Sequence, residues 1–126
     1  MPALEPVDAV RVVGTAAALD AARWTGDGVD VIRIAPDEAL GVGATGVEVD
    51  DPDAIIEPET GFSVALLSED DEHGVIDHIE WALERGSGIV AQGKVAGVPA
   101  KLVGGRPSVL VVQTAYAGEL RERLGW

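Results

Sequence analysis

The densest group of side chains that could bind a metal or act as acids and bases is Glu69-Asp70-Asp71-Glu72-His73, which His78 follows five residues later. Carboxylates and imidazoles are the donors that calcium and zinc sites use. On a helix, however, His73 and His78 would lie about 140° apart, too far round to share one ion as an i, i+4 pair does. Acidic residues at a helix start are stabilised by the helix dipole. We therefore expect no metal site here.

A second candidate is the glycine motif Gly41-Val-Gly43-Ala-Thr-Gly46, which has the GxGxxG spacing of dinucleotide-binding loops. Such a loop binds its cofactor because the N-terminus of a helix follows it and faces the pyrophosphate. Here the acidic residues 47–52 follow instead, and their charge would repel a diphosphate. We interpret the motif as a glycine-rich hairpin and predict no cofactor.

The remaining patterns typical of catalysis are incomplete. Ser63 lies one glycine short of the nucleophile elbow of serine hydrolases, on a stretch predicted to be a strand rather than a strained turn. Residues 50–61 carry two prolines where a calcium-binding loop needs glycine and regularly spaced acids. The absence of cysteine excludes disulfides, thiolate catalysis and cysteine-bound zinc. We predict no catalytic residues and expect no independent catalytic activity, although the sequence leaves that question open.

The charge of the chain limits its partners. Its 126 residues include 22 acidic and 9 basic side chains, a formal charge of −13, which should repel nucleic acids. The acidity fits either high solubility or an acidic face for a basic partner, and both interpretations stay open. No run of 18 apolar residues is present, and the N-terminus carries an acid where a signal peptide carries lysine or arginine. We therefore expect a soluble cytoplasmic protein without membrane contact.

The elements that must position these residues are short. Residues 1–8, with two prolines and no periodicity, predict a flexible N-terminal arm, and residues 9–126 predict a single domain. Pro52 and Pro58 predict a loop or an edge strand across residues 46–61. Strands are predicted at residues 10–13, 29–35, 39–45, 62–67, 89–95, 98–103 and 109–112, with a turn at Pro36 and with the last three strands forming an antiparallel meander. Helices are predicted at residues 16–24 with Thr15 as the cap, at residues 69–85, and at residues 115–124 with Thr114 as the cap and Gly125 at the end. The predicted fold is α+β, with antiparallel hairpins and two to three helices on one face of the sheet.

The second helix carries the interface prediction. Ser68 and Asp71 form a capping-box pattern at its start, and a helical wheel places Trp81 away from the apolar stripe, on the side of Asp77 and His78. Arg85, four residues on, could cover the ring in a cation–π contact, or a partner or loop could pack over it. The candidate interface residues are Trp81, His78, Asp77, Arg85 and the C-terminal Trp126, which is either tucked onto the domain or offered to another chain.

Three stretches of the chain resemble one known family. They are Arg33-Ile-Ala-Pro-Asp-Glu38, Ala91-Gln-Gly-Lys-Val-Ala-Gly-Val-Pro-Ala-Lys101 and Thr114-Ala-Tyr-Ala-Gly-Glu-Leu120, and over about residues 29–124 the chain resembles the gamma subunit of heterotetrameric sarcosine oxidase. That family belongs with the aminomethyltransferase and folate-binding-domain group. The resemblance implies a fold similar to folate-binding domains and a subunit that helps to build a complex without carrying its flavin or folate chemistry.

Two functions follow for this chain. The first is a non-catalytic binding or assembly module that contacts a protein partner or a second copy of itself. Because the chain is shorter than the family and carries an acidic insert between Asp50 and Glu59, a stand-alone homodimer stays open. The alternative is a stand-alone folate- or small-molecule-binding protein of one-carbon metabolism, in which Asp37, Glu38 or Glu59 would hold the donor edge of a pterin.

Overall fold

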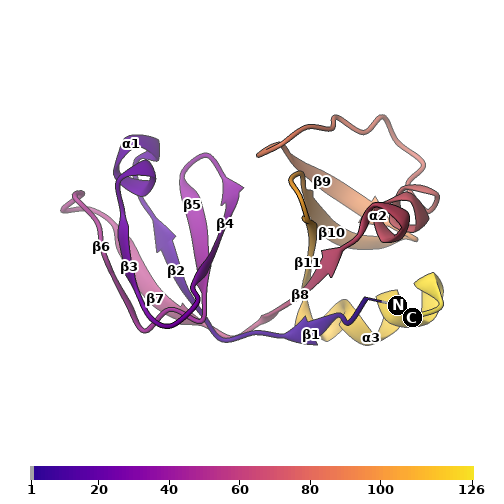
Figure 1. Ribbon diagram of the computed structural model, residues 1–126, viewed down its shortest axis with the longest axis horizontal. Coiled ribbons are helices and arrows are strands. Elements are labelled where there is room, and N and C mark those ends of the chain that lie inside the picture. The colour runs from indigo at the N-terminus through magenta and orange to yellow at the C-terminus, as the bar shows by residue number, and fades with distance from the viewer. Residues whose placement is uncertain (1) are drawn as a thin grey trace. The chain divides into compact units, whose positions relative to one another are not determined.

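The computed structural model describes residues 2–126 and groups them into two compact units (Figure 1). The terminal unit contains the residues up to Pro6 together with Gly61–Trp126, and the inserted unit is Val7–Thr60. The sequence predicts a single domain over residues 9–126, whereas the backbone contacts form these two groups. As predicted, the structure is a mixed α+β fold built on antiparallel sheets, and strands dominate it.

The terminal unit is built on a five-stranded antiparallel sheet with the order β1-β8-β11-β10-β9. Its strands are β1 (Glu5–Pro6), β8 (Phe62–Leu67), β9 (Val90–Val95), β10 (Val98–Val103) and β11 (Ser108–Gln113). The predicted three-strand meander is therefore confirmed. Ala96 and Gly97 both have positive φ, of 48° and 81°, which suits a two-residue hairpin because its twist matches that of the strands.

One face of this sheet and two helices, α2 (Glu69–Ile76) and α3 (Thr114–Leu124), contribute to the same core. Successive strand residues point to opposite faces, so Ala65 and Leu67 alternate with Val64 and Leu66, and only the first pair is buried. The buried core residues include Leu4, Ala65, Leu67, Val75, Leu102, Leu110, Val112, Ala117 and Leu120. That all helices of the chain lie on one face stays a prediction.

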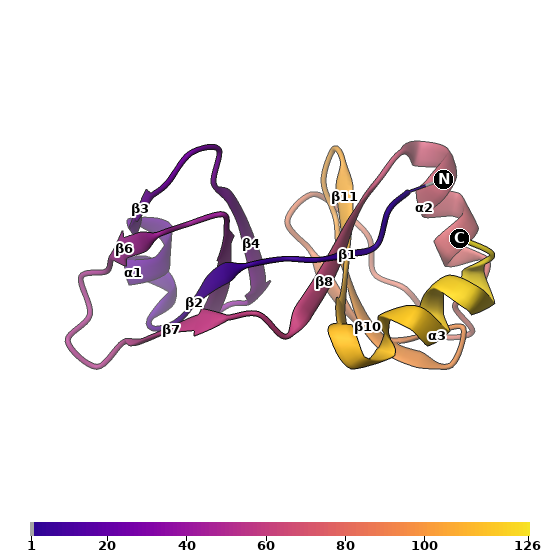
Figure 2. The ribbon, with the colours of Figure 1, turned by 90° about the horizontal axis from the view of Figure 1, so that it is seen from below.

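The first residues of the chain belong to this core. Leu4 is 1% exposed, and its carbonyl oxygen accepts a hydrogen bond of 2.8 Å from Nη1 of Arg121. Strand β1 pairs with β8, with Glu5 opposite Val64. In Figure 2, seen from below, β1 passes across β8. Most of the predicted flexible arm over residues 1–8 is thus held by burial of Leu4 and by strand pairing, signals that the local composition does not contain.

The inserted unit contains a four-stranded antiparallel sheet with the order β4-β5-β2-β7 and a small β3-β6 pair. Its elements are β2 (Ala9–Val13), α1 (Ala16–Asp20), β3 (Arg23–Thr25), β4 (Asp30–Ala35), β5 (Glu38–Val42), β6 (Gly46–Glu48) and β7 (Ile55–Glu59). The predicted strands and the turn at Pro36 are confirmed. Strand β7 lies at the sheet edge and contains Pro58, as expected for a residue without a backbone N–H.

The predicted helix at residues 16–24 is wrong beyond Asp20. The side chain of Thr15 caps α1 as expected, but Trp24 lies in β3 and pairs with Val47. The indole packs directly on Gly41, where a Cβ atom would lie 2.3 Å from the ring. Gly41 is therefore needed for this contact, which accounts for the first glycine of the GxGxxG motif without a cofactor.

The predicted helix at residues 69–85 is confirmed at its start and wrong beyond Ile76. Ser68 accepts from the backbone N–H of Asp71, and the Asp71 side chain accepts from the N–H of Ser68, which completes the capping box. After Ile76 the chain turns, and the backbone N–H of Ala96 donates to the carbonyl of His78 over 2.9 Å. This tertiary bond fastens the following segment to the end of β9, so the helix stops.

The last helix begins one residue earlier than predicted. Thr114 is its first residue rather than its cap, and its hydroxyl lies 3.0 Å from that of the buried Ser63. Gly125 ends the helix in the left-handed conformation with φ of 74°, as predicted. No helix within residues 2–126 has the length and apolar character needed to span a membrane.

Candidate functional site

A pocket of about 870 Å³ opens in the terminal unit where β8 passes into α2 and where β10 turns into β11. Three segments form its walls: the first residues of α2, the loop after Leu83, and the loop that joins β10 to β11. The lining residues are Leu67, Ser68, Glu69, Glu72, Arg85, Gly86, Ser87, Gly104, Gly105, Arg106, Pro107 and Ser108. All of them belong to the terminal unit, so one compact unit contains the whole site.

A single carboxylate links the three walls. Oε1 of Glu72 accepts a hydrogen bond of 2.8 Å from Nη2 of Arg85, and Oε2 accepts one of 3.1 Å from Oγ of Ser108. The Glu72 side chain is 19% exposed and Ser108 is 1% exposed, so the carboxylate end of this network is partly shielded from water, while the Arg85 side chain is 51% exposed. Ser108 is one of two buried polar residues within residues 2–126, and its hydroxyl is satisfied by Glu72.

Two glycines bring the arginine-bearing loops into direct backbone contact. A Cβ atom on Gly104 would lie 1.8 Å from the carbonyl oxygen of Gly86. The backbone N–H of Gly88 donates to the Gly104 carbonyl over 3.0 Å, and the Gly104 N–H donates to Ile89 over 2.9 Å. Arg85 precedes Gly86 directly and Arg106 lies two residues after Gly104, so this contact fixes the spacing of the two arginine backbones.

Arg106 differs from the other arginines in having no partner. It is exposed, lines the pocket, and makes no hydrogen bond or ion pair within residues 2–126. Each of the other six donates to a carboxylate or a backbone carbonyl: Arg11, Arg23, Arg33, Arg85, Arg121 and Arg123. Arg106 therefore presents a guanidinium at the pocket that no described residue pairs with.

The prediction that Trp81 lies on the outer face of a helix is wrong. Its residue position lies beyond the end of α2, and the ring packs against the core and onto Gly93, where a Cβ atom would lie 2.4 Å from it. The indole N–H donates to the carbonyl of Lys94 over 2.9 Å. The Trp81 side chain therefore covers the free edge of β9, which would otherwise expose unpaired backbone groups.

The remaining predicted interface residues each make contacts of their own, and their role in an interface stays a prediction. Arg85 pairs with Glu72 in the pocket, and the i, i+4 geometry assumed for a cation–π contact is absent. Asp77 is the C-cap of α2, and Nδ1 of His78 lies 2.9 Å from the carbonyl of Gly74. Trp126 packs against the core of the terminal unit, which is the first of the two alternatives considered for it.

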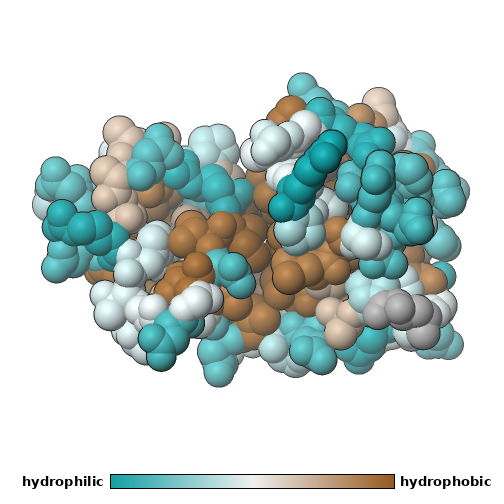
Figure 3. Space-filling model, viewed as in Figure 1, coloured by the Kyte–Doolittle hydropathy of each residue, from teal (hydrophilic) through white to brown (hydrophobic). Residues whose placement is uncertain are grey.

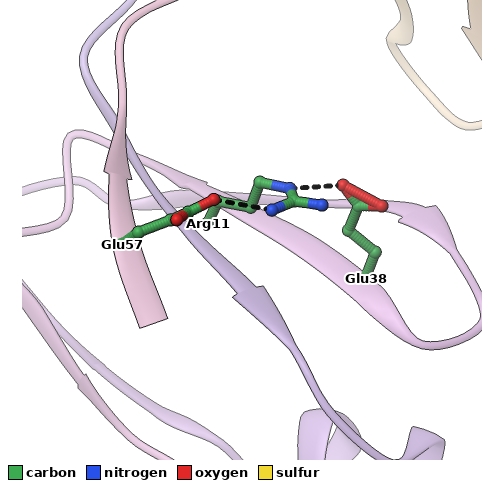
Figure 4. Close-up of polar contacts among 3 residues, drawn as sticks. All are labelled: Arg11, Glu38 and Glu57. Atoms are coloured by element: carbon green, nitrogen blue, oxygen red, sulfur yellow. Dashed lines mark hydrogen bonds and ion pairs between the residues drawn. The ribbon is translucent and has the colours of Figure 1, made fainter. Parts of the chain in front are cut away.

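The acids considered for a pterin lie in the inserted unit and none of them lines the pocket. Glu38 accepts from Nε of Arg11 over 2.6 Å, and Glu57 accepts from Nη1 over 2.7 Å (Figure 4). The hydrogen bond with Glu38 is the main reason that the pKa of Arg11 is raised. The stabilising effect of the positive charge on Arg11 is lost only when the pH rises through this raised pKa. Glu38 therefore remains paired with Arg11 near neutral pH.

The sequence analysis missed Arg106, Ser108 and the paired glycines. Their one local signal is the order Gly104-Gly105-Arg106-Pro107, a turn between two apolar strands that carries a single charge.

Within residues 2–126, no three His, Asp or Glu side chains are grouped so as to hold a metal ion. In the view of Figure 3, hydrophilic and hydrophobic residues both reach the surface, and the exposed large hydrophobic residues are Val31, Ile55, Ile56, Leu66 and Tyr116.

Comparison of the chain with protein families and with curated proteins gives no match to a family model and no match to a curated protein.

Proposed function

We propose that this chain is a non-catalytic binding module whose ligand is a small molecule with an anionic group, held by Arg106 in the pocket of the terminal unit. The observation that carries the proposal is the free Arg106 guanidinium, the one arginine without a partner within residues 2–126. Arginine presents several N–H donors in a planar fork that fits carboxylate or phosphate oxygens. A non-catalytic role agrees with what the resemblance to the sarcosine oxidase gamma subunit implies.

The pocket has the means to bind the rest of a ligand. Leu67 and Pro107 give it an apolar wall, while Ser68 and Ser87 add polar groups. A few convergent polar groups in a concave, partly apolar site are typical of small-molecule pockets. This arrangement favours the small-molecule side of the alternative that we derived from the sequence. It does not favour a pterin held by Glu38, because Arg11 already occupies that carboxylate.

Replacing Arg106 with glutamine is expected to abolish most of the anion binding. With acetate as the probe, we expect a dissociation constant on the order of 1 mM for the original chain and at least tenfold weaker binding for Arg106→Gln, a loss of about 1.4 kcal/mol. The measurement is a ¹H–¹⁵N NMR titration that follows the arginine Nε–H signals. The matched control is Arg23→Gln, which removes an exposed arginine paired with Glu48 in the inserted unit. Equal acetate affinity in all three proteins would contradict the proposal.

Assembly with a protein partner or a second copy is the second candidate function. The observation that favours it is the exposure of large apolar side chains, most of all Leu66, which is 58% exposed opposite Val109 on the sheet face away from the core. Self-association through Leu66 predicts a sedimentation coefficient that rises with protein concentration, and more steeply at high salt, because salt screens the repulsion between chains of charge −13. Concentration-independent monomers, unaffected by Leu66→Ser, would contradict self-association.

A further inference from the structure

The hydrogen bonds of the Glu72 carboxylate determine how many positive charges in the pocket are free to bind a ligand. Both oxygens of its carboxylate are used, one by Arg85 and one by Ser108. The charge of Arg85 is therefore balanced by a contact within the pocket, whereas Arg106 has no such contact. The four charged lining residues, Glu69, Glu72, Arg85 and Arg106, have a formal sum of zero. One cation, and not two, is free for a ligand.

The same carboxylate also fixes positions. Ser108 lies two residues after Arg106 at the start of β11, so the Ser108 hydrogen bond anchors the loop that carries Arg106. On the other side, the bond to Arg85 holds that guanidinium against α2. The contact of Gly86 with Gly104 sets the spacing of the backbones, and Glu72 then sets where each side chain or loop end points.

Resting on the proposed function, we propose that Glu72 is a positioning residue that determines specificity: it makes the pocket select a singly charged carboxylate over a phosphate dianion. A planar carboxylate is matched in charge and shape by one guanidinium through two parallel hydrogen bonds. A phosphate dianion needs a second cation, and Arg85 is held by Glu72. The strong negative charge of the whole chain further disfavours a dianion.

The test compares acetate with methyl phosphate at pH 8, where the second ionisation of a phosphate monoester, with a pKa of about 6, is complete. Both probes are titrated into the full chain by NMR. We expect acetate to bind at least tenfold more tightly than methyl phosphate. The Glu72→Gln substitution frees Arg85, while the amide oxygen of the new side chain can still accept a hydrogen bond from Ser108. The substitution should reduce the preference for acetate over methyl phosphate at least tenfold, mainly through stronger methyl phosphate binding.

The matched control is Glu69→Gln, which removes the same charge from the same pocket wall without releasing an arginine, because Glu69 has no partner within residues 2–126. We expect it to leave the ratio of the two affinities within about threefold of the original, since net charge alone changes by a single unit. An equal change of the ratio in Glu69→Gln and Glu72→Gln would overturn the specificity role. So would equal affinity of the original chain for both probes.

If the proposed function itself is wrong, neither acetate nor methyl phosphate binds the original chain. That result is distinct from those above, and it would also rule out the specificity role of Glu72. If Glu72→Gln does not fold, Arg85→Gln provides the second test. It should gain no methyl phosphate binding, because the second cation is removed rather than freed, and the charge left on Glu72 should weaken the binding of both probes. Methyl phosphate binding that is tighter in Arg85→Gln than in the original chain would overturn the assignment of Glu72.

Discussion

Gly104→Ala is expected to destabilise the chain by about 3 kcal/mol and to abolish anion binding in the fraction that still folds. The new methyl group would lie 1.8 Å from the carbonyl oxygen of Gly86 and 2.8 Å from its carbonyl carbon. Backbone atoms cannot move away as the end of a flexible side chain can, so the two loops must separate. Such a separation breaks the hydrogen bonds of Gly104 with Gly88 and Ile89 and moves Arg85 away from Arg106.

Urea unfolding followed by circular dichroism measures the stability change, and acetate titration by NMR measures the binding. Gly74→Ala is the matched control because Gly74 lies in α2 with no atom within 4 Å of its would-be Cβ. Alanine there favours the helix by roughly 1 kcal/mol and should stabilise the protein slightly. If Gly104→Ala unfolded at the same urea concentration as the original chain, the close contact between the loops would be disproved.

Leu120→Ala is expected to cost about 3 kcal/mol, a large part of the roughly 5–15 kcal/mol by which domains of this kind are stable. Leu120 is fully buried and projects from α3 into the core of the terminal unit. Removing its side chain leaves a cavity between the helix and the sheet, where Leu110 and Val112 lie in the same cluster. The surrounding backbone cannot collapse into that space, because strand pairing fixes it on both sides of β11.

The comparison for this variant is Leu66→Ala, which removes an equal number of atoms from a side chain that is 58% exposed. Surface truncations of this kind change stability by roughly 0.5 kcal/mol or less. The difference between the two midpoints of urea unfolding then isolates the effect of burial. Similar midpoints for the two variants would show that α3 does not pack on the sheet as described.

Strands and caps could be predicted from the sequence because their signals are local. Short valine-containing runs separated by glycine turns predicted β9, β10 and β11, and the Ser68–Asp71 spacing predicted the start of α2. Gly125 likewise marked the end of α3. Each of these signals acts over a few residues, so no knowledge of the partner strand or helix was needed.

The end of α2 could not be predicted, because apolar residues that follow it fit both a helical and a strand-like periodicity. Ile79, Trp81 and Leu83 are each partly buried while Glu80, Ala82 and Glu84 are exposed, an alternation of period two. Val75, Ile76, Ile79 and Leu83 also fit one side of a helical wheel, although Trp81 does not. The hydrogen bonds that decide the matter, from Trp81 to Lys94 and from Ala96 to His78, join residues 13 and 18 positions apart.

The pocket was also beyond local analysis. Glu72, Arg85 and Ser108 come from a helix, a loop and a strand, and only the folded chain brings their side chains together. The helical model instead placed Arg85 beside Trp81, four residues away. The turn sequence around Arg106 marks a loop but not a binding site, because the significance of Arg106 lies in the partner it lacks within residues 2–126, and that is a property of the fold.

The entry and exit of the inserted unit lie side by side. Pro6 faces Ser63 just before the chain enters it, and Ala9 faces Glu59 inside it, so the chain leaves and rejoins the five-stranded sheet at neighbouring points. A segment bounded in this way can be lengthened, shortened or exchanged by one event in the gene without altering the register of the sheet around it. Length variants of this architecture should therefore differ most between Pro6 and Gly61, while the pocket wall from Leu67 to Ser108 keeps its size.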